Sequence, residues 1–130
     1  MKKRICLILM LIALAGQSWA QETNRNQFSS APETSRYQIV QSELAAKITL
    51  KIDKYTGRVF QLVQGSKGLS WQLIVAEKHS EDKATPDKVN YQVFTSGLAV
   101  RMTYLLNVNT GATWQLSEDN EIGVFWKALE

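Results

Sequence analysis

The sequence predicts an all-β protein, in which two duplicated antiparallel β-meander units pack as a small barrel or sandwich after an N-terminal signal peptide. Three observations support this prediction. Apolar and polar residues alternate with a period of two in short segments, as expected of strands with one buried face. Two segments have the composition of hairpin turns that contain Thr-Gly. The two halves of the chain after the leader are similar to each other, which indicates a repeat.

Residues 1–20 are predicted to form a bacterial secretory signal. A basic cluster at positions 2–4 precedes an apolar run, Ile5 to Gly16, and small residues follow at Ser18 and Ala20. The alternative is an N-terminal membrane anchor, but a helix over this run would cover about 18 Å, less than the roughly 30 Å core of a bilayer. We therefore expect signal cleavage after Ala20, a periplasmic or secreted protein, and no membrane insertion after signal cleavage.

Signal cleavage would change the charge of the protein. The chain has 15 Lys and Arg against 12 Asp and Glu, a net charge of +3, and one cysteine. Three of the basic residues and Cys6 lie in the predicted signal, so the remaining chain would be neutral and free of thiols. This excludes a disulfide framework within the chain and cysteine catalysis. It also removes the electrostatic argument for binding nucleic acid or anionic lipid.

Residues 21–35 are polar, contain Pro32 and are predicted to be a disordered leader, because they cannot bury enough apolar surface to offset the entropy of ordering. The alternative is a segment that becomes ordered on a partner.

The remaining chain, residues 36–130, is predicted to be a single β domain made of two repeats. At an offset of 54 positions, residues 37–62 match residues 91–116 with ten identities in 26 positions and no gap. Chance similarity between two β-rich stretches would rarely keep its register over this length, so we interpret the match as a duplication. The repeats cover residues 36–77 and 90–130, and a charged linker, 78–89, joins them.

Each repeat is predicted to contain four short strands. The second strand of the first repeat alternates, with a dry face made of Ile48, Leu50 and Ile52. The dry face of the matching strand in the second repeat is predicted to be Met102, Tyr104 and Leu106. Neither four-stranded unit would be stable alone, because its apolar face needs the other unit. The remaining predicted strands are Tyr37–Gln41, Tyr91–Thr95, Trp71–Ala76, Val124–Leu129 and the segments around Phe60–Leu62 and Trp114–Leu116.

Two hairpin turns are predicted from side chains that favour turns. Asp or Asn at a turn start accepts hydrogen bonds from backbone N–H groups two residues on, and Gly supplies the positive φ at the far end. A metal- or ligand-binding role for the Asp and Asn is the alternative, but both repeats use the position for the same turn. The structural turn residues are Asp53, Thr56, Gly57, Asn107, Thr110 and Gly111.

The phrase D-x-x-T-G-x-x-aromatic occurs in the first repeat, within Leu50 to Phe60 and after an R-Y-Q-hydrophobic-V strand at 36–40, and the second repeat carries it with Asn107 in place of the Asp, within Leu105 to Trp114. With these features the chain resembles small bacterial secreted or envelope proteins of uncharacterised function that carry a repeated D-x-x-T-G-x-x-W hairpin. The phrase is also similar to the blade motif of quinoprotein-type β-propellers, from which it departs by one residue in the Gly-to-aromatic spacing. Two units are too few to close a propeller. The resemblance implies a β-meander and no catalytic residues.

Few residues suggest catalysis or metal binding. His79 is the only histidine and lies in the charged linker, where we interpret it as a solvated loop residue rather than a base of a Ser-His-Asp site. One His and no Cys disfavour a zinc site. The stretch 118–121 offers oxygens that Ca²⁺ prefers, but it lacks the spacing of a calcium loop. No phosphate-binding or dinucleotide motif is present, so we expect no cofactor and no metal.

The aromatic residues give the sharpest candidate for a binding surface, although most of them are expected in the core of so small a fold. Adjacent strand residues point to opposite faces, so Phe125 and Trp126 cannot both enter one core layer, and one ring is expected to be markedly exposed. The proposed ligand-binding residues are Trp71, Phe125 and Trp126.

The sequence therefore favours a non-enzymatic binding or interaction module that uses an aromatic sheet face. The partner would be a protein, a glycan or a small ligand, and no nucleic acid is expected. One alternative is a structural or assembly component of the envelope that associates by strand pairing; homo-oligomerisation is left open. The other is a hydrolase of unrecognised type, with paired carboxylates that the sequence does not identify.

Overall fold

The computed structural model describes residues 31–42 and 48–130, and in these ranges the protein is all-β, as predicted. A short 3₁₀ helix, η1 (Val100–Met102), is its one helical element there. The predicted signal and residues 21–30 of the predicted leader lie outside the described residues. The strands are β1 (Tyr37–Gln41), β2 (Thr49–Asp53), β3 (Arg58–Gly65), β4 (Gly68–Ala76), β5 (Tyr91–Thr95), β6 (Thr103–Asn107), β7 (Thr113–Asp119) and β8 (Gly123–Leu129).

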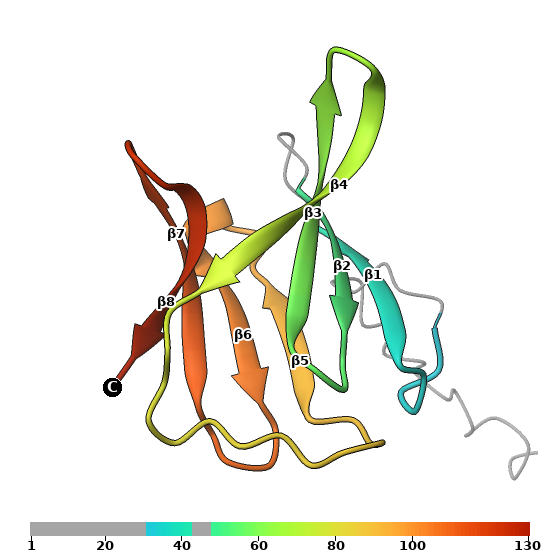
Figure 1. The fold of residues 1–130 in the computed structure, drawn as a ribbon, viewed down its shortest axis with the longest axis vertical. Helices are drawn as coiled ribbons and strands as arrows, with labels where there is room; N and C mark the ends of the chain where they lie inside the picture. Colours follow the sequence, from blue (N-terminus) through green and yellow to red (C-terminus); the bar gives the residue numbers. More distant parts are fainter. Residues whose placement is uncertain (1–30, 43–47) are drawn as a thin grey trace, which may run out of the picture.

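All strands join one sheet in the order β1-β2-β3-β4-β8-β7-β6-β5. The first four strands form one antiparallel meander and the last four form another. The two meanders join where β4 runs parallel to β8, through the pairs Val75–Phe125 and Ala76–Trp126. The sheet curls until its edge strands, β1 and β5, approach each other, so it is a nearly closed barrel (Figure 1).

The hairpin turns form at the two Thr-Gly segments. Asp53 Oδ1 accepts a hydrogen bond from the N–H of Tyr55 (3.1 Å), and Asn107 Oδ1 accepts one from the N–H of Asn109 (3.0 Å). Gly57 has a φ of 73°, a conformation that residues with a Cβ rarely adopt. These turns lie at the lower end of the barrel as drawn in Figure 1, and the linker between β4 and β5 crosses the same end.

Among residues 31–42 and 48–130, the backbone bonds that close the seam between the two edge strands lie at this lower end. The Lys54 carbonyl accepts hydrogen bonds from the N–H groups of Asn90 (2.8 Å) and Tyr91 (2.9 Å). The N–H of Lys54 donates in turn to the carbonyl of Arg36 (2.8 Å). Above this point β1 and β5 are the two free ends of the sheet order in the described part of the chain.

The two meanders bury opposite faces of matching strands. In β2 the buried apolar side chains are Leu50 and Ile52, and Asp53 at its end is buried in its ion pair with Arg36, whereas in β6 the buried side chains are Thr103, Leu105 and Asn107. The predicted dry face of β6 is therefore wrong: Met102 is exposed, and Tyr104 and Leu106 are only half-buried.

The topology explains this inversion. Equivalent strands run in the same direction on the two sides of the β4–β8 junction, and their order is reversed. The only rotation that superimposes one such meander on the other is a half-turn about an axis parallel to the strands. This rotation exchanges the two faces of the sheet, so matching residues of the two meanders point to opposite faces. Residue pairs nevertheless match in register, since Tyr37 pairs with Asp53 as Tyr91 pairs with Asn107.

The core lies inside the barrel and draws on both meanders. Trp126 and Trp114 supply its largest side chains, and Tyr91 is the third aromatic residue in the cluster. The clustered core residues are Ile48, Leu50, Ile52, Val59, Ile74, Tyr91, Val93, Leu105, Ala112, Trp114, Leu116 and Trp126.

Candidate functional site

The side of the first meander that points away from the core carries many apolar side chains. Directly paired residues of antiparallel strands share a face, so the register forms rows across β1 to β4, such as Ile39, Lys51, Phe60 and Leu73. We call this surface the outer face. Its residues are Tyr37, Ile39, Gln41, Thr49, Lys51, Asp53, Arg58, Phe60, Leu62, Gln64, Leu69, Trp71, Leu73 and Val75.

The outer face exposes residues whose counterparts in the second meander form the core. Tyr37 is 55% exposed and Ile39 is 51% exposed, whereas the matching Tyr91 and Val93 are 4% and 2% exposed. Scattered exposed apolar residues are ordinary, but a contiguous exposed patch marks an interaction surface in soluble proteins. Leu69, Leu73 and Val75 are further exposed members of the same face.

Cationic side chains lie over the aromatic rings of the outer face. The Lys51 Nζ lies 4.9 Å from the centre of the Phe60 ring and 4.7 Å from that of Trp71. The Arg58 Cζ lies 5.5 Å from the Phe60 ring centre. These separations are those of cation–π contacts, which hold the cations over the apolar surface.

Arg36 and Asp53 form the ion pair at the lower edge of this face. The guanidinium binds the carboxylate through two atoms, Nε at 3.1 Å and Nη2 at 2.8 Å, and also stacks on the rings of Tyr37 and Tyr55. Burial of Asp53 acts to raise its pKa, but hydrogen bonds from Arg36 and from the N–H of Tyr55 outweigh burial and leave the pKa below its usual value. The hydrogen bond to Asp53 raises the pKa of Arg36.

The outer face has an excess of positive charge. A hollow of about 420 Å³ is lined by Tyr37, Lys51, Asp53, Arg58 and Phe60. Arg36 neutralises Asp53, and this is the one ion pair between side chains that the structure shows in its described residues. Lys51 and Arg58 therefore have no carboxylate partner there, and the surface is chemically suited to an anionic, partly apolar ligand.

The three residues proposed from the sequence as ligand-binding fall on different sides of the sheet. Trp71 lies on the outer face and is half-buried under Lys51. Phe125 continues this face across the junction, because it pairs with Val75, but it is half-buried rather than markedly exposed. Trp126 is fully buried in the core, with no hydrogen-bond partner for its indole N–H, and so is not accessible to a ligand.

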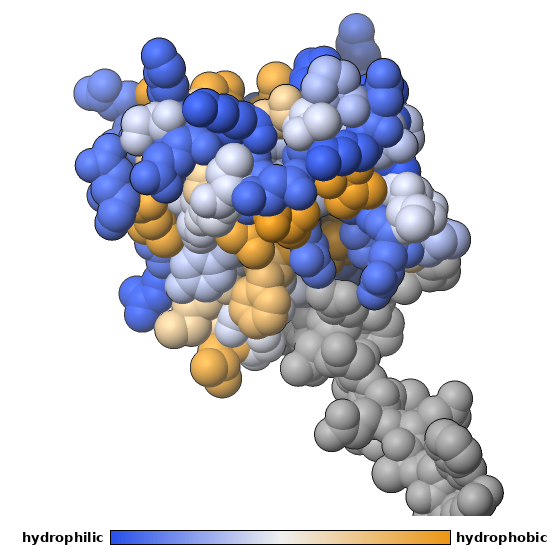
Figure 2. Space-filling view, turned by 90° about the horizontal axis from the view of Figure 1, so that it is seen from below, coloured by the Kyte–Doolittle hydropathy of each residue, from blue (hydrophilic) through white to orange (hydrophobic). Residues whose placement is uncertain are grey.

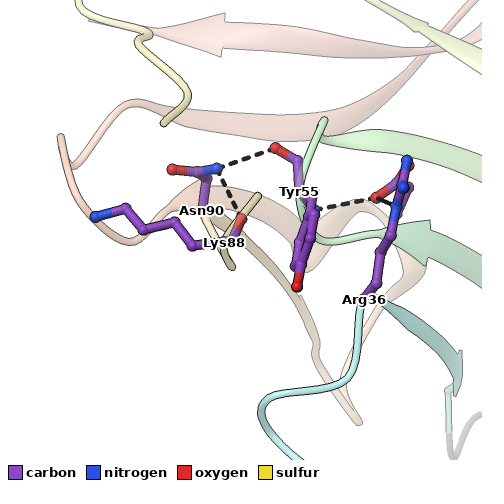
Figure 3. Close-up of polar contacts among 5 residues, drawn as sticks. Arg36, Tyr55, Lys88 and Asn90 are labelled. Carbon is purple, nitrogen blue, oxygen red and sulfur yellow. Dashed lines mark hydrogen bonds and ion pairs between the residues drawn. The ribbon is translucent and has the colours of Figure 1, made fainter. Parts of the chain in front are cut away.

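The turn residues serve the fold at the lower end. Figure 3 shows how the side chain of the fully buried Asn90 reaches the backbone of Tyr55 and Lys88, and how Tyr55 leads on to Arg36 through Asp53. Asn107 Nδ2 donates to Asp82 Oδ1 (2.8 Å). Thr110 and Gly111 lie in the second turn, and Thr56 and Gly57 in the first, with backbone N–H bonds from Gly57 and Gly111 to the carbonyls that open each turn.

A second hollow, of about 300 Å³, lies between the linker and the lower end of the barrel, and His79, Asp82, Tyr91 and Trp114 line it. Seen from below, hydrophilic residues dominate the upper part of the view, and hydrophobic ones reach the surface in the middle (Figure 2).

His79 is half-buried and not the solvated loop residue that we predicted. Its Nδ1 accepts from the N–H of Glu81 (3.2 Å), so its Nε2 carries the hydrogen and donates to the Leu129 carbonyl (3.0 Å).

Tyr91 and Asp82, two further polar residues of this hollow, are bonded to each other. The Tyr91 hydroxyl donates to the Asp82 carboxylate at 2.8 and 3.0 Å. Burial, with the hydrogen bond and charge of Asp82, raises the pKa of Tyr91 to about 12. His79 instead meets the edge of the Trp114 ring, with ring centres 5.3 Å apart. The arrangement anchors the linker onto the barrel.

The acidic stretch 118–121 covers the end of β7 and the start of the turn that leads to β8. Asp119 Oδ1 accepts hydrogen bonds from the N–H groups of Glu121 (2.8 Å) and Ile122 (3.3 Å). Within residues 31–42 and 48–130, no group of three or more His, Cys, Asp or Glu side chains could hold a metal ion.

The sequence interpretation missed most of the outer face. Neither Lys51 nor Arg58 was among the candidate site residues. Phe60 and Leu62 carried the usable signal, since they alternate with apolar Val59 and Val63 on the opposite face of β3. A strand that is apolar on both sides, within an open meander, indicates either double burial or a docking surface.

In the described ranges, no helix has both the length and the apolar character needed to cross a membrane. The chain matches no protein-family model, and no curated protein or solved structure is similar to it. The resemblances drawn from the hairpin phrase therefore stay predictions.

Proposed function

We propose that the protein is a non-enzymatic binding module, and that the outer face of the first meander is its interface. The observation that carries this proposal is the exposure of Tyr37, Ile39, Leu73 and Val75 on one continuous sheet surface. Leaving such residues in water forgoes about 1.5 to 3 kcal/mol for each large side chain that a partner could bury. A partner that covers this surface would recover part of that free energy.

The proposal includes the location expected from the sequence. A secreted or periplasmic protein meets other envelope or extracellular molecules, and the hydrophobic stretch in residues 1–20 supports export. The absence of a thiol after the predicted cleavage site suits an oxidising compartment. The partner is a molecule with an apolar surface of its own and a negative charge to complement Lys51 and Arg58.

Site-specific photo-crosslinking in the native cells tests this function. Full-length chain is expressed with benzoylphenylalanine at Ile39 or Leu73 on the outer face, and at Gln92 or Lys127 on the exposed side of the second meander as matched controls. We expect the same discrete adduct from both outer-face positions and none from the controls. Adducts of equal yield from all four positions, or none from Ile39 and Leu73, would contradict the proposal.

A second candidate function is assembly by strand pairing between copies of this chain. It is favoured by the composition of the two edge strands, since Tyr37–Gln41 and Tyr91–Thr95 contain neither a charge nor a proline. Sedimentation analysis of the purified protein at micromolar concentration distinguishes the two. A dimer or larger species supports assembly, and a monomer supports the binding module.

A further inference from the structure

The free edge of β1 has a defined set of unpaired backbone groups. The N–H of Ser42 donates to the Ile48 carbonyl (3.0 Å), and the Arg36 carbonyl accepts from the N–H of Lys54 (2.8 Å). In an antiparallel ladder the residues that bond to the neighbour alternate with those that point away. The backbone N–H and C=O groups of Tyr37, Ile39 and Gln41 therefore point away from β2, toward the open seam.

This edge lacks three of the features that normally prevent strand addition, and β5 lies near it at the lower end of the seam. Natural edges are protected by Lys, Pro, bulges or covering segments. β1 carries none of the first three: its sequence is YQIVQ, and its pairing with β2 is continuous from Tyr37 to Gln41. Three alternate residues with free N–H and C=O groups form a template for an added strand.

A lysine without a carboxylate partner in the described part of the chain lies one strand in from the same edge, and its ammonium rests over the Phe60 and Trp71 rings. Lys51 stands directly next to Ile39 in its row of the sheet. A strand added beside β1 would place its Cα about 10 Å from that of Lys51, two strand spacings away. The side chains of a lysine and a glutamate together span that distance once Lys51 turns from the Phe60 and Trp71 rings toward β1, and Ile39 between them would form an apolar floor.

We propose that the β1 edge binds an extended acidic peptide segment of a partner protein, which adds as a strand beside β1 and places its carboxylates against Lys51. This inference rests on the proposed function and names the partner's chemistry. An acidic glycan could meet the cations, but it lacks the alternating backbone donors and acceptors that pair with Tyr37, Ile39 and Gln41. A second copy would bring Lys51 and Arg58 of both chains toward one surface, with like charges opposed.

Binding of a designed peptide tests the inference. The probe is the fluorescein-labelled, capped octapeptide with the repeat Val-Glu, titrated by anisotropy against protein purified from cells that express the full chain. We expect saturable binding with a Kd below about 1 mM. Amide hydrogen exchange at Tyr37, Ile39 and Gln41 should slow by about tenfold or more on binding. The Val-Lys octapeptide should bind at least about tenfold more weakly.

Two modifications separate edge pairing from charge. N-methylation of alternate residues of the Val-Glu peptide removes its backbone donors and should abolish binding without touching the protein. Lys51→Glu should weaken binding by about fivefold to tenfold, whereas Lys127→Glu on the exposed side of β8 should leave it unchanged. Lys51→Met, which keeps most of the apolar stem, should give an intermediate loss and serves if Lys51→Glu fails to fold.

Several results would overturn the inference. Equal binding of the N-methylated peptide would exclude strand addition, and equal binding of the Val-Lys peptide would exclude the acidic preference. Tighter binding of an oligogalacturonate than of the Val-Glu peptide would assign the site to glycans. Absence of saturable peptide binding, together with crosslinks from Ile39 and Leu73 in cells, would reject this inference and leave the proposed function intact; loss of those crosslinks would reject the proposed function itself.

Discussion

Asn90 is the residue on which the lower end of the barrel depends. Its Nδ2 donates to the carbonyls of Tyr55, Thr85 and Lys88, and its Oδ1 accepts from the N–H of Thr85 (2.8 Å) and from Asn109 Nδ2 (2.9 Å). These bonds join the first turn, the second turn and the linker at a point that water does not reach. A buried polar group is favourable only while it is fully bonded, so this side chain permits no substitute of different hydrogen-bonding pattern.

We predict that Asn90→Ala lowers the free energy of unfolding by about 3 kcal/mol or more, because it leaves several buried backbone groups without partners. Asn109→Ala is the matched control, because Asn109 is exposed and donates one hydrogen bond to Asn90. Its loss should lower the free energy of unfolding by about 1 kcal/mol or less. Urea denaturation followed by tryptophan fluorescence measures both. Equal losses for the two variants would show that Asn90 is not the centre of the network.

The Tyr91–Asp82 hydrogen bond predicts a loss of stability at high pH. The pKa of Tyr91 is about 12 in the folded protein, against about 10 for an unfolded chain. As pH rises from about 10 toward 12, the unfolded state loses the phenolic proton while the folded state keeps it, so the unfolded state binds fewer protons and stability falls. In Tyr91→Phe this contribution is absent. The difference in urea midpoint between the two proteins should therefore shrink between about pH 8 and pH 11; a constant difference would contradict the assignment.

At the scale of elements, the two hairpins look equivalent in sequence but differ in what surrounds their glycines. Both glycines have positive φ, 73° at Gly57 and 83° at Gly111. A Cβ at Gly57 would lie 3.0 Å from the buried ring of Tyr91, whereas a Cβ at Gly111 would meet nothing within 4 Å. The first hairpin therefore packs against β5 at its glycine, whereas the glycine of the second faces open space even though that turn is bonded to Asn90 and the linker.

We predict that Gly111→Ala costs about 1 kcal/mol, the strain of the left-handed conformation alone. Gly57→Ala should cost clearly more, because the Tyr91 ring must also move within a packed region. Thermal unfolding of the two variants side by side makes the comparison. A Gly57→Ala variant as stable as Gly111→Ala would mean that the ring of Tyr91 shifts without cost.

The elements could be predicted from the sequence because their signals are local. Alternation, Asx turns and positive-φ glycines identified the two Thr-Gly hairpins and the strands near their observed bounds. β4 begins at Gly68, earlier than the predicted strand Trp71–Ala76, because a tight turn joins it to the end of β3 at Gly65. Which face of each strand is buried is not a local property. The apolar side of β6 was misassigned because its alternation, with Leu at both 105 and 106, does not say which neighbour will cover it.

The whole molecule determines the candidate site through the parallel β4–β8 junction. Joining two similar meanders in parallel turns one of them over, so positions that match in sequence cannot all be buried. The second meander directs Tyr91, Val93 and Trp114 into the barrel, and the first directs the matching Tyr37, Ile39 and Phe60 outward. The outer face could not be predicted from the sequence because it depends on this junction, which rests on two residue pairs between strands about fifty residues apart.

Paired substitutions test this inversion across the whole fold. Ile39 and Val93 match in sequence, but Ile39 is half exposed on the outer face and Val93 is buried in the core. Ile39→Gln should change the free energy of unfolding by no more than about 0.5 kcal/mol, as expected for a surface position. Val93→Gln should cost about 3 kcal/mol or more, because it buries an amide without partners and removes apolar packing. If the two meanders instead buried the same face, the two variants would lose similar stability in urea, and the outer face would no longer be available to a partner.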